Sequence, residues 1–540
     1  MNLTSAPAAT EAEHDNAAWL RITGLQPGTR YYYRIAGATA AERAGTFQTL
    51  PSPESYRDAE TNPRGLFNFS FQFGSCANQK AGGAQGAKLP AYKTMRQQHG
   101  RKTLFQIMNG DWVYEEKREF TVEQWKKQTG AVETPRIAQL APSITGVWEN
   151  FKLYLERGET LSAWHRDMPG YFTPDDHEIL NDVYGTGSAG VKSQQAVFRD
   201  IALRGWYDYI AGSNPLATRQ PILFGRARVA GDVLTDESAD FTKVRAEESA
   251  NLHVHWGGQL AGVPPGQNPP KGDPNAGVYE VTAVLDAHRL RVRPGFTQEG
   301  DCVYSIGRHN YGSFRVGNVE VFLLDTRGMR ELHNVAHPEQ PGPLMLGKVQ
   351  HEWLKRSMAA SDADFFFIAS SVNLMIPHIG APNSTDPITG KDDAWTAFLA
   401  EREELLQFWE KLGKPVMVMT GDLHNSWSVK VTDRIWEFAA GPHNSQNHPT
   451  LSEGNRPANG EFDSRGRRCE IRWSSHIRND VPARLRWWPI YAVAQINNVY
   501  MNPRPDGSAR WVAYPKPHVV IQYFDGVTGD LLYAEPVHVR

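Results

Sequence analysis

The sequence predicts an α/β protein, because short apolar strands recur along it, helical segments separate them, and most strands run into a polar, ionisable loop. Nearly continuous apolar runs such as 364–369 and 415–419 are typical of strands buried on both faces, which implies sheets covered by helices. The 540 residues suffice for about two to four domains at roughly 150 residues each.

Strands and helices follow one another along most of the chain. We predict strands at 67–73, 103–108, 170–173, 319–324, 364–369 and 415–419, with closing strands at 491–496 and 518–523. The clearest helix is 395–412, whose apolar residues recur at helical spacing and which Gly413 would end. Further helices are predicted at 192–210 and 346–358.

Two segments depart from this pattern. Residues 1–52 contain three short strand patterns, at 19–22, 24–35 and 45–50, before a proline-rich link. They resemble the last three strands of a fibronectin type III-like domain, so we expect the N-terminus to be truncated. Residues 215–310 carry β-like runs around a Pro/Gly-rich stretch, which predicts a β-rich insertion in a main domain spanning 53–540.

The composition excludes several classes of protein. Apolar residues make up 40% of the chain, which excludes wholesale disorder. Because 57 basic residues nearly cancel 60 acidic ones, no overall field would gather nucleic acid or anionic lipid. Cys76, Cys302 and Cys469 are too few for a disulfide framework. No apolar stretch approaches the roughly 20 residues of a membrane span, and the first residues do not resemble a secretory signal.

Ionisable side chains gather where the predicted strands end. They are a thiol, a phenol, carboxylates and imidazoles: Cys76, Asp111, Tyr114, Asp176, His177, Asp422 and His424. Taken singly, each has an ordinary explanation as a turn residue, a buried cysteine or a hydrogen-bonded histidine. Because ligands bind beyond the carboxyl ends of strands in open α/β sheets, together they predict a shared site. Their mutual repulsion would be costly unless polyvalent cations offset it, which predicts a metal centre.

These residues lie in motifs of a known family. Residues 110–114 have the Gly-Asp-x-x-Tyr form of purple acid phosphatases. The other motifs are Gly-Ser-Cys at 74–76, Asp-Asp-His-Glu at 175–178, Phe-Arg-x-Gly at 314–317, Leu-Asp-Thr-Arg at 324–327, Trp395 with Arg402, and Gly-Asp-x-His at 421–424. The series resembles the PhoD-type alkaline phosphatases and phosphodiesterases over about residues 67–442.

The resemblance implies the calcineurin-like metallophosphoesterase fold, an α-β-β-α sandwich of two sheets flanked by helices. It also implies a site with Fe³⁺ and Ca²⁺, for which pairs of other ions such as Mn²⁺ or Zn²⁺ are the alternative. The iron ligands would be Cys76, Tyr114, His424 and, shared with calcium, Asp111. The calcium ligands would be Asp176, Asp422 and Asn181, and calcium's preference for oxygen suits them.

The implied activity is the hydrolysis of phosphate monoesters, diesters or both by a metal-activated hydroxide, with Asp111 and His177 as catalytic residues. His177 would stabilise the transition state or protonate the leaving oxygen. Arg327 and Asn373 would bind substrate. The alternatives are a structural Arg327 paired with Asp325, and an Asn373 that caps its loop.

The expected partner is a small-molecule phosphoester, with no obligatory nucleic acid and no transmembrane segment, and the expected state is a monomer. The arginine run 465–468 with nearby tryptophans leaves single-stranded nucleic acid as an alternative to a solvated or substrate-attracting face. A phospholipase D-like phosphodiesterase and a non-catalytic cell-surface binding protein are further alternatives. The resemblance implies a periplasmic or secreted location.

Overall fold

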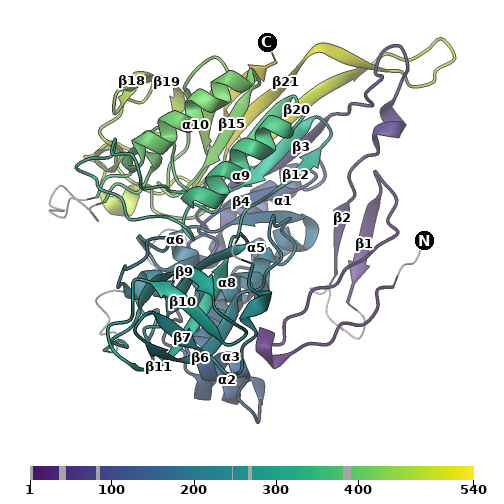
Figure 1. The fold of residues 1–540 in the computed structure, drawn as a ribbon. Coiled ribbons are helices and arrows are strands. Elements are labelled where there is room, and N and C mark those ends of the chain that lie inside the picture. Colours follow the sequence, from purple (N-terminus) through teal and green to yellow (C-terminus); the bar gives the residue numbers. More distant parts are fainter. Residues whose placement is uncertain are drawn as a thin grey trace.

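Two large sheets lie face to face in the upper half of the view in Figure 1. The computed structural model describes residues 4–35, 44–80, 86–245, 247–264, 271–380 and 391–539. Aromatic side chains fill the space between the sheets; the rings of Phe71 and Phe367, one from each sheet, meet edge to face with centroids 5.1 Å apart.

The first sheet has six strands in the order β22-β21-β20-β3-β4-β5. Its strands are β3 (Phe69–Gly74), β4 (Gln106–Asn109), β5 (Gly170–Thr173), β20 (Ile490–Met501), β21 (Trp511–Asp525) and β22 (Leu531–His538). Strands β3, β4 and β5 are mutually parallel, and the three C-terminal strands pair antiparallel. The two predicted closing strands are therefore confirmed as parts of β20 and β21.

The second sheet has eight strands in the order β12-β13-β14-β15-β17-β16-β19-β18. Its strands are β12 (Gly312–Val316), β13 (Val319–Leu323), β14 (Phe365–Ala369), β15 (Val416–Thr420), β16 (Trp427–Lys430), β17 (Ile435–Ala439), β18 (Gly460–Ser464) and β19 (Arg467–Ser474). The central strands β13, β14, β15 and β17 are parallel. Every residue of β14 and β15 is buried, which explains their unbroken apolar sequences.

Helices pack on the outer faces of both sheets, so the α/β prediction is confirmed. Beside the eight-stranded sheet lie α9 (Gly347–Ala360) and α10 (Leu399–Leu412), which Figure 1 shows in front of its strands. The helices on the side of the six-stranded sheet are α1 (Pro90–His99), α2 (Val122–Thr129), α3 (Arg136–Leu140), α4 (Ile144–Arg157), α5 (Glu159–Asp167), α6 (Asp176–Ile179) and α8 (Arg199–Trp206). The short helix α7 (Gln194–Val197) contacts α8 and residues 277–284 of the predicted insertion. A bilayer-spanning helix is not found in the described part of the chain.

Two predicted helices are interrupted. The predicted helix 395–412 begins with a 3₁₀ turn, Trp395–Ala397, and α10 then ends at Gly413, whose φ of 69° gives the left-handed cap that glycine favours. The predicted helix 192–210 is divided into α7, α8 and a π-helical turn, Tyr207–Ala211.

Residues within the predicted β-rich insertion form a closed six-stranded barrel, beside the sheets in Figure 1. Its strands are β6 (Leu223–Ala230), β7 (Val233–Thr235), β8 (Ser249–Val254), β9 (Gly277–Val284), β10 (Arg289–Arg293) and β11 (Gly300–Arg308). Inward residues such as Val229, Leu252 and Leu290 fill the barrel, and exposed residues alternate with them.

The N-terminal segment differs from its prediction. Among its described residues, 4–35 and 44–52, β1 (Arg30–Arg34) and β2 (Ala44–Gln48) are the two strands, and they pair antiparallel. The predicted strand 19–22 is wrong, because Trp19 instead packs on the helical layer and its indole N–H donates to the carbonyl oxygen of Tyr207 at 3.2 Å. Side-chain anchoring of this kind overrides a short alternating pattern.

The carboxyl ends of the parallel strands in both sheets meet at one edge. Asn109, at the end of β4, joins them: its amide donates to the carbonyl oxygens of Ser370 at 2.8 Å and Met419 at 2.9 Å, which lie at the ends of β14 and β15. Its own oxygen accepts a hydrogen bond from Thr173 at the end of β5. Loops from both sheets therefore share one region.

Replacing Asn109 with leucine should destabilise the protein by about 2–5 kcal/mol, because the substitution leaves buried carbonyl and hydroxyl groups unpaired. Denaturant unfolding measures this effect. The matched control is Gln495→Leu on the exposed face of β20, which should change the unfolding free energy by less than about 0.5 kcal/mol. Equal midpoints for Asn109→Leu and the wild type would contradict the proposed link between the sheets.

Candidate metal centre

Four of the predicted ligands lie on backbone with positive φ. The φ angles are 62° at Cys76, 57° at Asp111, 63° at Asp422 and 53° at His424. Side-chain-bearing residues adopt this region at a cost, and such positions concentrate at functional sites. The carboxylate of Glu178 supports one of these turns, since it accepts hydrogen bonds from the backbone N–H groups of Asp111, Trp112 and Asp175 at 2.7–3.0 Å.

The first ligand group combines sulfur, phenol, imidazole and carboxylate. Asp111 Oδ2 lies 3.4 Å from Cys76 Sγ and 3.0 Å from the Tyr114 hydroxyl, which in turn lies 3.1 Å from His424 Nε2. His424 Nδ1 lies 2.9 Å from the carbonyl oxygen of Gln446, to which it donates. This orientation leaves the lone pair of Nε2 directed at the group, as in metal-ligating histidines. Burial lowers the pKa of His424 to about 4, so its ring is neutral.

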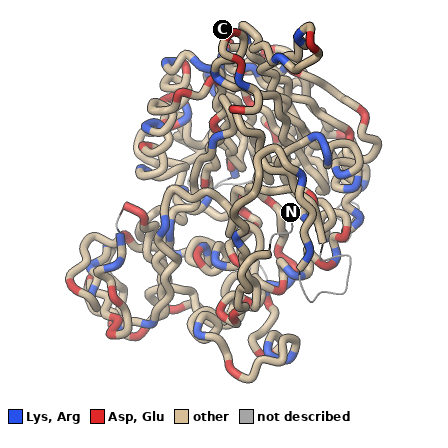
Figure 2. Tube along the Cα trace, turned by 90° about the vertical axis from the view of Figure 1, so that its right-hand side faces the viewer, with Lys and Arg blue, Asp and Glu red and all other residues tan. Residues whose placement is uncertain are grey.

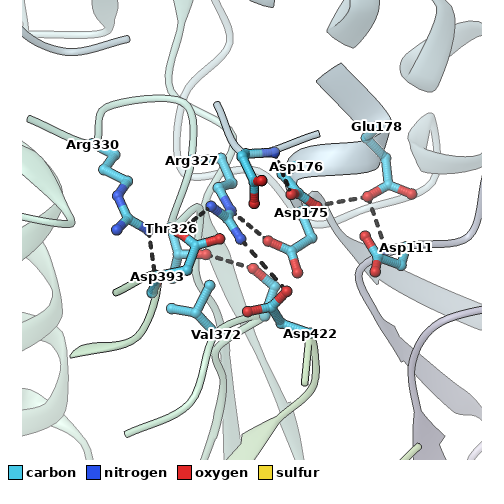
Figure 3. A network of polar contacts seen from close by, with 12 residues as sticks. Asp111, Asp175, Asp176, Glu178, Thr326, Arg327, Arg330, Val372, Asp393 and Asp422 are labelled. Atoms are coloured by element: carbon cyan, nitrogen blue, oxygen red, sulfur yellow. Dashed lines mark hydrogen bonds and ion pairs between the residues drawn. The ribbon is translucent and has the colours of Figure 1, made fainter. Parts of the chain in front are cut away.

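The second group is made of carboxylates (Figure 3). Oxygen atoms of Asp175, Asp176 and Asp422 lie within 4.8 Å of one another, as do those of Asp176, Asp182 and Asp393. Three buried oxygens, Asp111 Oδ1, Asp175 Oδ2 and Asp176 Oδ1, have no hydrogen-bond partner among the described residues. Buried carboxylate oxygens without partners are costly, and cations are the partners that suit them.

Burial and mutual repulsion disfavour the ionised forms of these groups. Burial is the main cause that raises the pKa values of Asp111, Asp175 and Asp176, and neighbouring carboxylates add to it. The pKa values of Cys76 and Tyr114 are raised for the same reasons. The protein alone therefore does not stabilise this set of anions, whereas bound cations would.

Fixed cations compensate one side of the acidic group. Burial would raise the pKa of Asp393, but Arg327, Arg330 and Lys391 hold it well below its usual value. Arg327 Nη1 donates to Asp393 Oδ1 at 2.7 Å, and Arg330 Nη1 lies 2.8 Å from the same oxygen.

The side chain of Arg327 contacts carboxylates other than Asp325, and its role in substrate binding stays a prediction. Its side chain is completely buried, and its Nε donates to Asp175. Asp325, the predicted partner of its side chain, instead accepts from the backbone N–H of Arg327 at 3.1 Å. Of the guanidinium nitrogens, Nη2 has no hydrogen bond among the described residues and lies 4.0 Å from Asp422. We interpret Arg327 as a cross-link between carboxylates.

His177 is held by a residue that the sequence did not single out. Its Nδ1 lies 2.8 Å from Glu115 Oε2, and its ring packs on Tyr114 with centroids 3.9 Å apart. Burial would lower the pKa of His177, but Glu115, Asp176 and Asp111 raise it well above its usual value, so the ring is charged. Burial opposes ionisation of Glu115, yet His177 lowers its pKa to about 2.

The remaining predicted residues lie in different environments. Asn181 is exposed, and it forms hydrogen bonds through its backbone N–H and carbonyl oxygen. Its neighbour Asp182 supplies a carboxylate to the second group. Asn373 is fully buried, with both polar side-chain atoms lacking a partner among the described residues. His378 Nδ1 lies 2.7 Å from Asp422 Oδ2, and this contact holds the pKa of Asp422 below its usual range despite burial.

Sequence reasoning missed Asp182, Asp393 and Glu115 as members of the site. Asp393 precedes the predicted helix at 395, and Asp182 lies in a turn, so neither follows a strand. Glu115 directly follows the Gly-Asp-x-x-Tyr motif, and this adjacency was the one available signal.

The arginine run is largely neutralised. Among the ion pairs are Arg465 with Asp392, Arg467 with Glu403, Arg472 with Glu470, and Arg478 with Asp480. Figure 2 likewise shows acidic and basic segments interspersed along the trace. Because these arginines already pair with acidic side chains, the segment does not favour the binding of nucleic acid.

Replacing Glu115 with glutamine should lower the pKa of His177, because the substitution removes the largest influence that raises it. An NMR titration of ¹³C-labelled histidine rings measures this change, with the His177 signal assigned by substitution. Glu119→Gln, at an exposed position four residues away, should leave the titration unchanged. An unaltered His177 titration in Glu115→Gln would disprove the pairing.

Comparison with known proteins identifies relatives of this chain. The family model described as PhoD-like phosphatase matches residues 71–229 and 298–477, more than half of the chain. Alkaline phosphatase D of Bacillus subtilis (strain 168) is 22% identical over 415 residues, which cover 75% of this chain and 52% of that protein. The chain thus spans about half the length of this curated relative.

A solved structure entitled "Structure of PhoD" shares the fold. It is 18% identical, with a TM-score of 0.50, and the match covers 94% of this chain and 78% of the other. The family match includes the segments that carry Cys76, Asp111, Asp176 and Asp422. The chain therefore belongs to the PhoD-like phosphatase family.

Proposed function

We propose that this protein is a metal-dependent phosphoesterase that hydrolyses phosphate monoesters, diesters or both. The observation that carries the proposal is the close approach of two ligand groups joined by Asp111, one rich in soft and aromatic donors and one composed of carboxylates. Membership of the PhoD-like phosphatase family supports it. A binding protein without catalysis would have no need for so many unpaired buried acids.

The architecture supports the same proposal. We propose that the two sheets with their outer helices are the metallophosphoesterase sandwich, and that residues 53–540 form this domain with the barrel inserted in it. The pair β1–β2 would be the remnant of a fibronectin-like module within residues 1–52. The common edge of the sheets at Asn109 supports this assignment, because that edge carries the ligand groups.

The donor chemistry suits ferric iron in the first group and calcium in the second. Cys76, Tyr114 and His424 with Asp111 would hold Fe³⁺, since phenolate and thiolate are strong anionic ligands. Asp111, Asp176 and Asp422 would hold Ca²⁺, and the unpaired oxygens of Asp111, Asp175 and Asp176 support an oxygen-ligated cation there. The exposure of Asn181 weakens its own candidacy.

Bound cations would supply Lewis-acid polarisation of the phosphoryl group and would lower the pKa of water in the site. The chain's own residues would orient the substrate and manage protons. His177, charged and fixed by Glu115, would stabilise negative charge on the phosphoryl group or give its proton to the leaving oxygen. The unpaired amide of Asn373 would bind substrate oxygen. Arg327 would keep Asp175 and Asp393 in place.

Replacing Asp111 with asparagine should reduce hydrolysis of p-nitrophenyl phosphate and bis-p-nitrophenyl phosphate by about a thousandfold, equivalent to about 4 kcal/mol, and should reduce the bound metal. Initial rates and elemental analysis of the same samples measure both effects. Asp286→Asn, on the exposed rim of the barrel, is the matched control and should leave both unchanged. Full hydrolysis by Asp111→Asn would refute the proposed function.

Replacing Tyr114 with phenylalanine should abolish a visible absorption band, because charge transfer from phenolate to ferric iron requires the phenolic oxygen. The absorption spectrum of the purified protein measures this, with iron content determined in parallel. Tyr32→Phe, at a highly exposed position, should keep the band. A wild-type spectrum without such a band, in protein that contains iron, would argue against Tyr114 as an iron ligand.

A further inference from the structure

Three histidine rings form a row along the candidate metal centre. The ring of His448 lies between those of His424 and His378, with centroids 4.8 Å and 5.3 Å away and both contacts edge to face. His424 belongs to the group with Tyr114 and Asp111, whereas His378 contacts Asp422. His448 is therefore adjacent to both ligand groups, although it belongs to neither.

The backbone around His448 is fixed to the turn that carries His424. The amide of Asn425 donates to the carbonyl oxygen of His448 at 2.9 Å, and the amide of Asn447 donates to that of His424 at 2.8 Å. Gln446 accepts from His424 Nδ1. A segment that orients one proposed ligand thus also sets the position of the His448 ring.

The imidazole of His448 is the one ring of the three without a hydrogen bond to a described residue. Its Nδ1 is enclosed and unpaired. A buried N–H donor without a partner is rarer than a buried acceptor without one. We therefore treat the unpaired Nδ1 as the acceptor and assign the ring proton to Nε2. Nε2–H then remains available to a ligand bound beside the two groups.

We propose that His448 contacts the substrate and donates a hydrogen bond from Nε2 to a phosphoryl oxygen. This inference rests on the proposed phosphoesterase function, because it needs an anionic phosphoryl group between the two ligand groups. A neutral donor at this position complements the charged His177 beside Tyr114. Hydrogen bonds to anionic oxygen are stronger than those between neutral groups, so the contact would contribute to binding and to rate.

Three substitutions of His448 test the donor and its position. His448→Phe keeps a ring of similar shape without a donor, His448→Gln places an amide N–H near the position of Nε2, and His448→Asn has a shorter side chain that does not reach it. The measurements are kcat/KM for p-nitrophenyl phosphate and bis-p-nitrophenyl phosphate, the inhibition constant of inorganic phosphate, iron and calcium content, and thermal unfolding. The control is His337→Gln, an exposed residue outside the centre.

We expect His448→Phe and His448→Asn to lower kcat/KM by about 10- to 100-fold and to weaken phosphate inhibition, with metal content and unfolding temperature unchanged. His448→Gln should stay within about fivefold of the wild type, and the control should match it. If His448→Phe fails to fold, the test is the ratio of kcat/KM between His448→Gln and His448→Asn, which should be about 10 or more if Nε2–H contacts the substrate.

Three outcomes overturn the inference. Wild-type kinetics and phosphate inhibition in His448→Asn or in folded His448→Phe would show that His448 does not contact the substrate. The proposed function would not be affected by this result. Loss of iron or calcium in His448→Asn would make His448 a support for the metal centre instead. Absence of hydrolysis by metal-loaded wild-type protein would refute the proposed function itself, and this inference with it.

Discussion

The repulsion among buried carboxylates is the constraint on which the rest of this structure depends. Asp111, Asp175, Asp176 and Asp422 come from loops of both sheets and lie close together at the edge where the parallel strands end. Their burial makes charge expensive, and each carboxylate makes the next harder to ionise. These carboxylates can all be ionised together only if positive charge is supplied to them.

The chain supplies that charge unevenly. Arg327, Arg330 and Lys391 converge on Asp393, and His378 accompanies Asp422. On the side of Asp111 and Asp176, the charged group is His177, which donates a hydrogen bond to Glu115. Unpaired oxygens of Asp111 and Asp176 lie on this less compensated side. This asymmetry is the physical argument for cations between the two ligand groups.

Much of the rigid structure around the site serves to hold these side chains together. Glu178 ties the Asp111 turn to the start of α6, and Asn109 ties the ends of strands from both sheets. The segment containing Gln446 and Asn447 fixes the His424 turn. Because each tie is a hydrogen bond to backbone, it helps to hold the turns in which the ligands adopt positive φ angles.

The α/β class and most core strands could be predicted from the sequence. Unbroken apolar runs, such as those of β14 and β15, indicate strands that are buried on both faces. Residues directly after strands, such as Cys76 and Asp111, could also be expected to converge, since strand direction fixes where they lie. Their roles stay predictions.

Residues on loops without periodicity could not be predicted. Asp182, Asp393 and His448 reach the site only through the tertiary path of their loops. The error at Trp19 has the same origin, since a contact distant in sequence decided that local structure. The partners of Arg327 likewise depend on loops that meet only in the folded chain.

The most direct test of the account is a crystallographic measurement of anomalous scattering above and below the iron absorption edge. The account predicts an iron peak bounded by Cys76, Tyr114, His424 and Asp111, and a lighter cation beside Asp176 and Asp422. The contradicting result would be a map of metal-loaded protein without an anomalous peak among these side chains. In that map the side chains would remain hydrogen-bonded to one another.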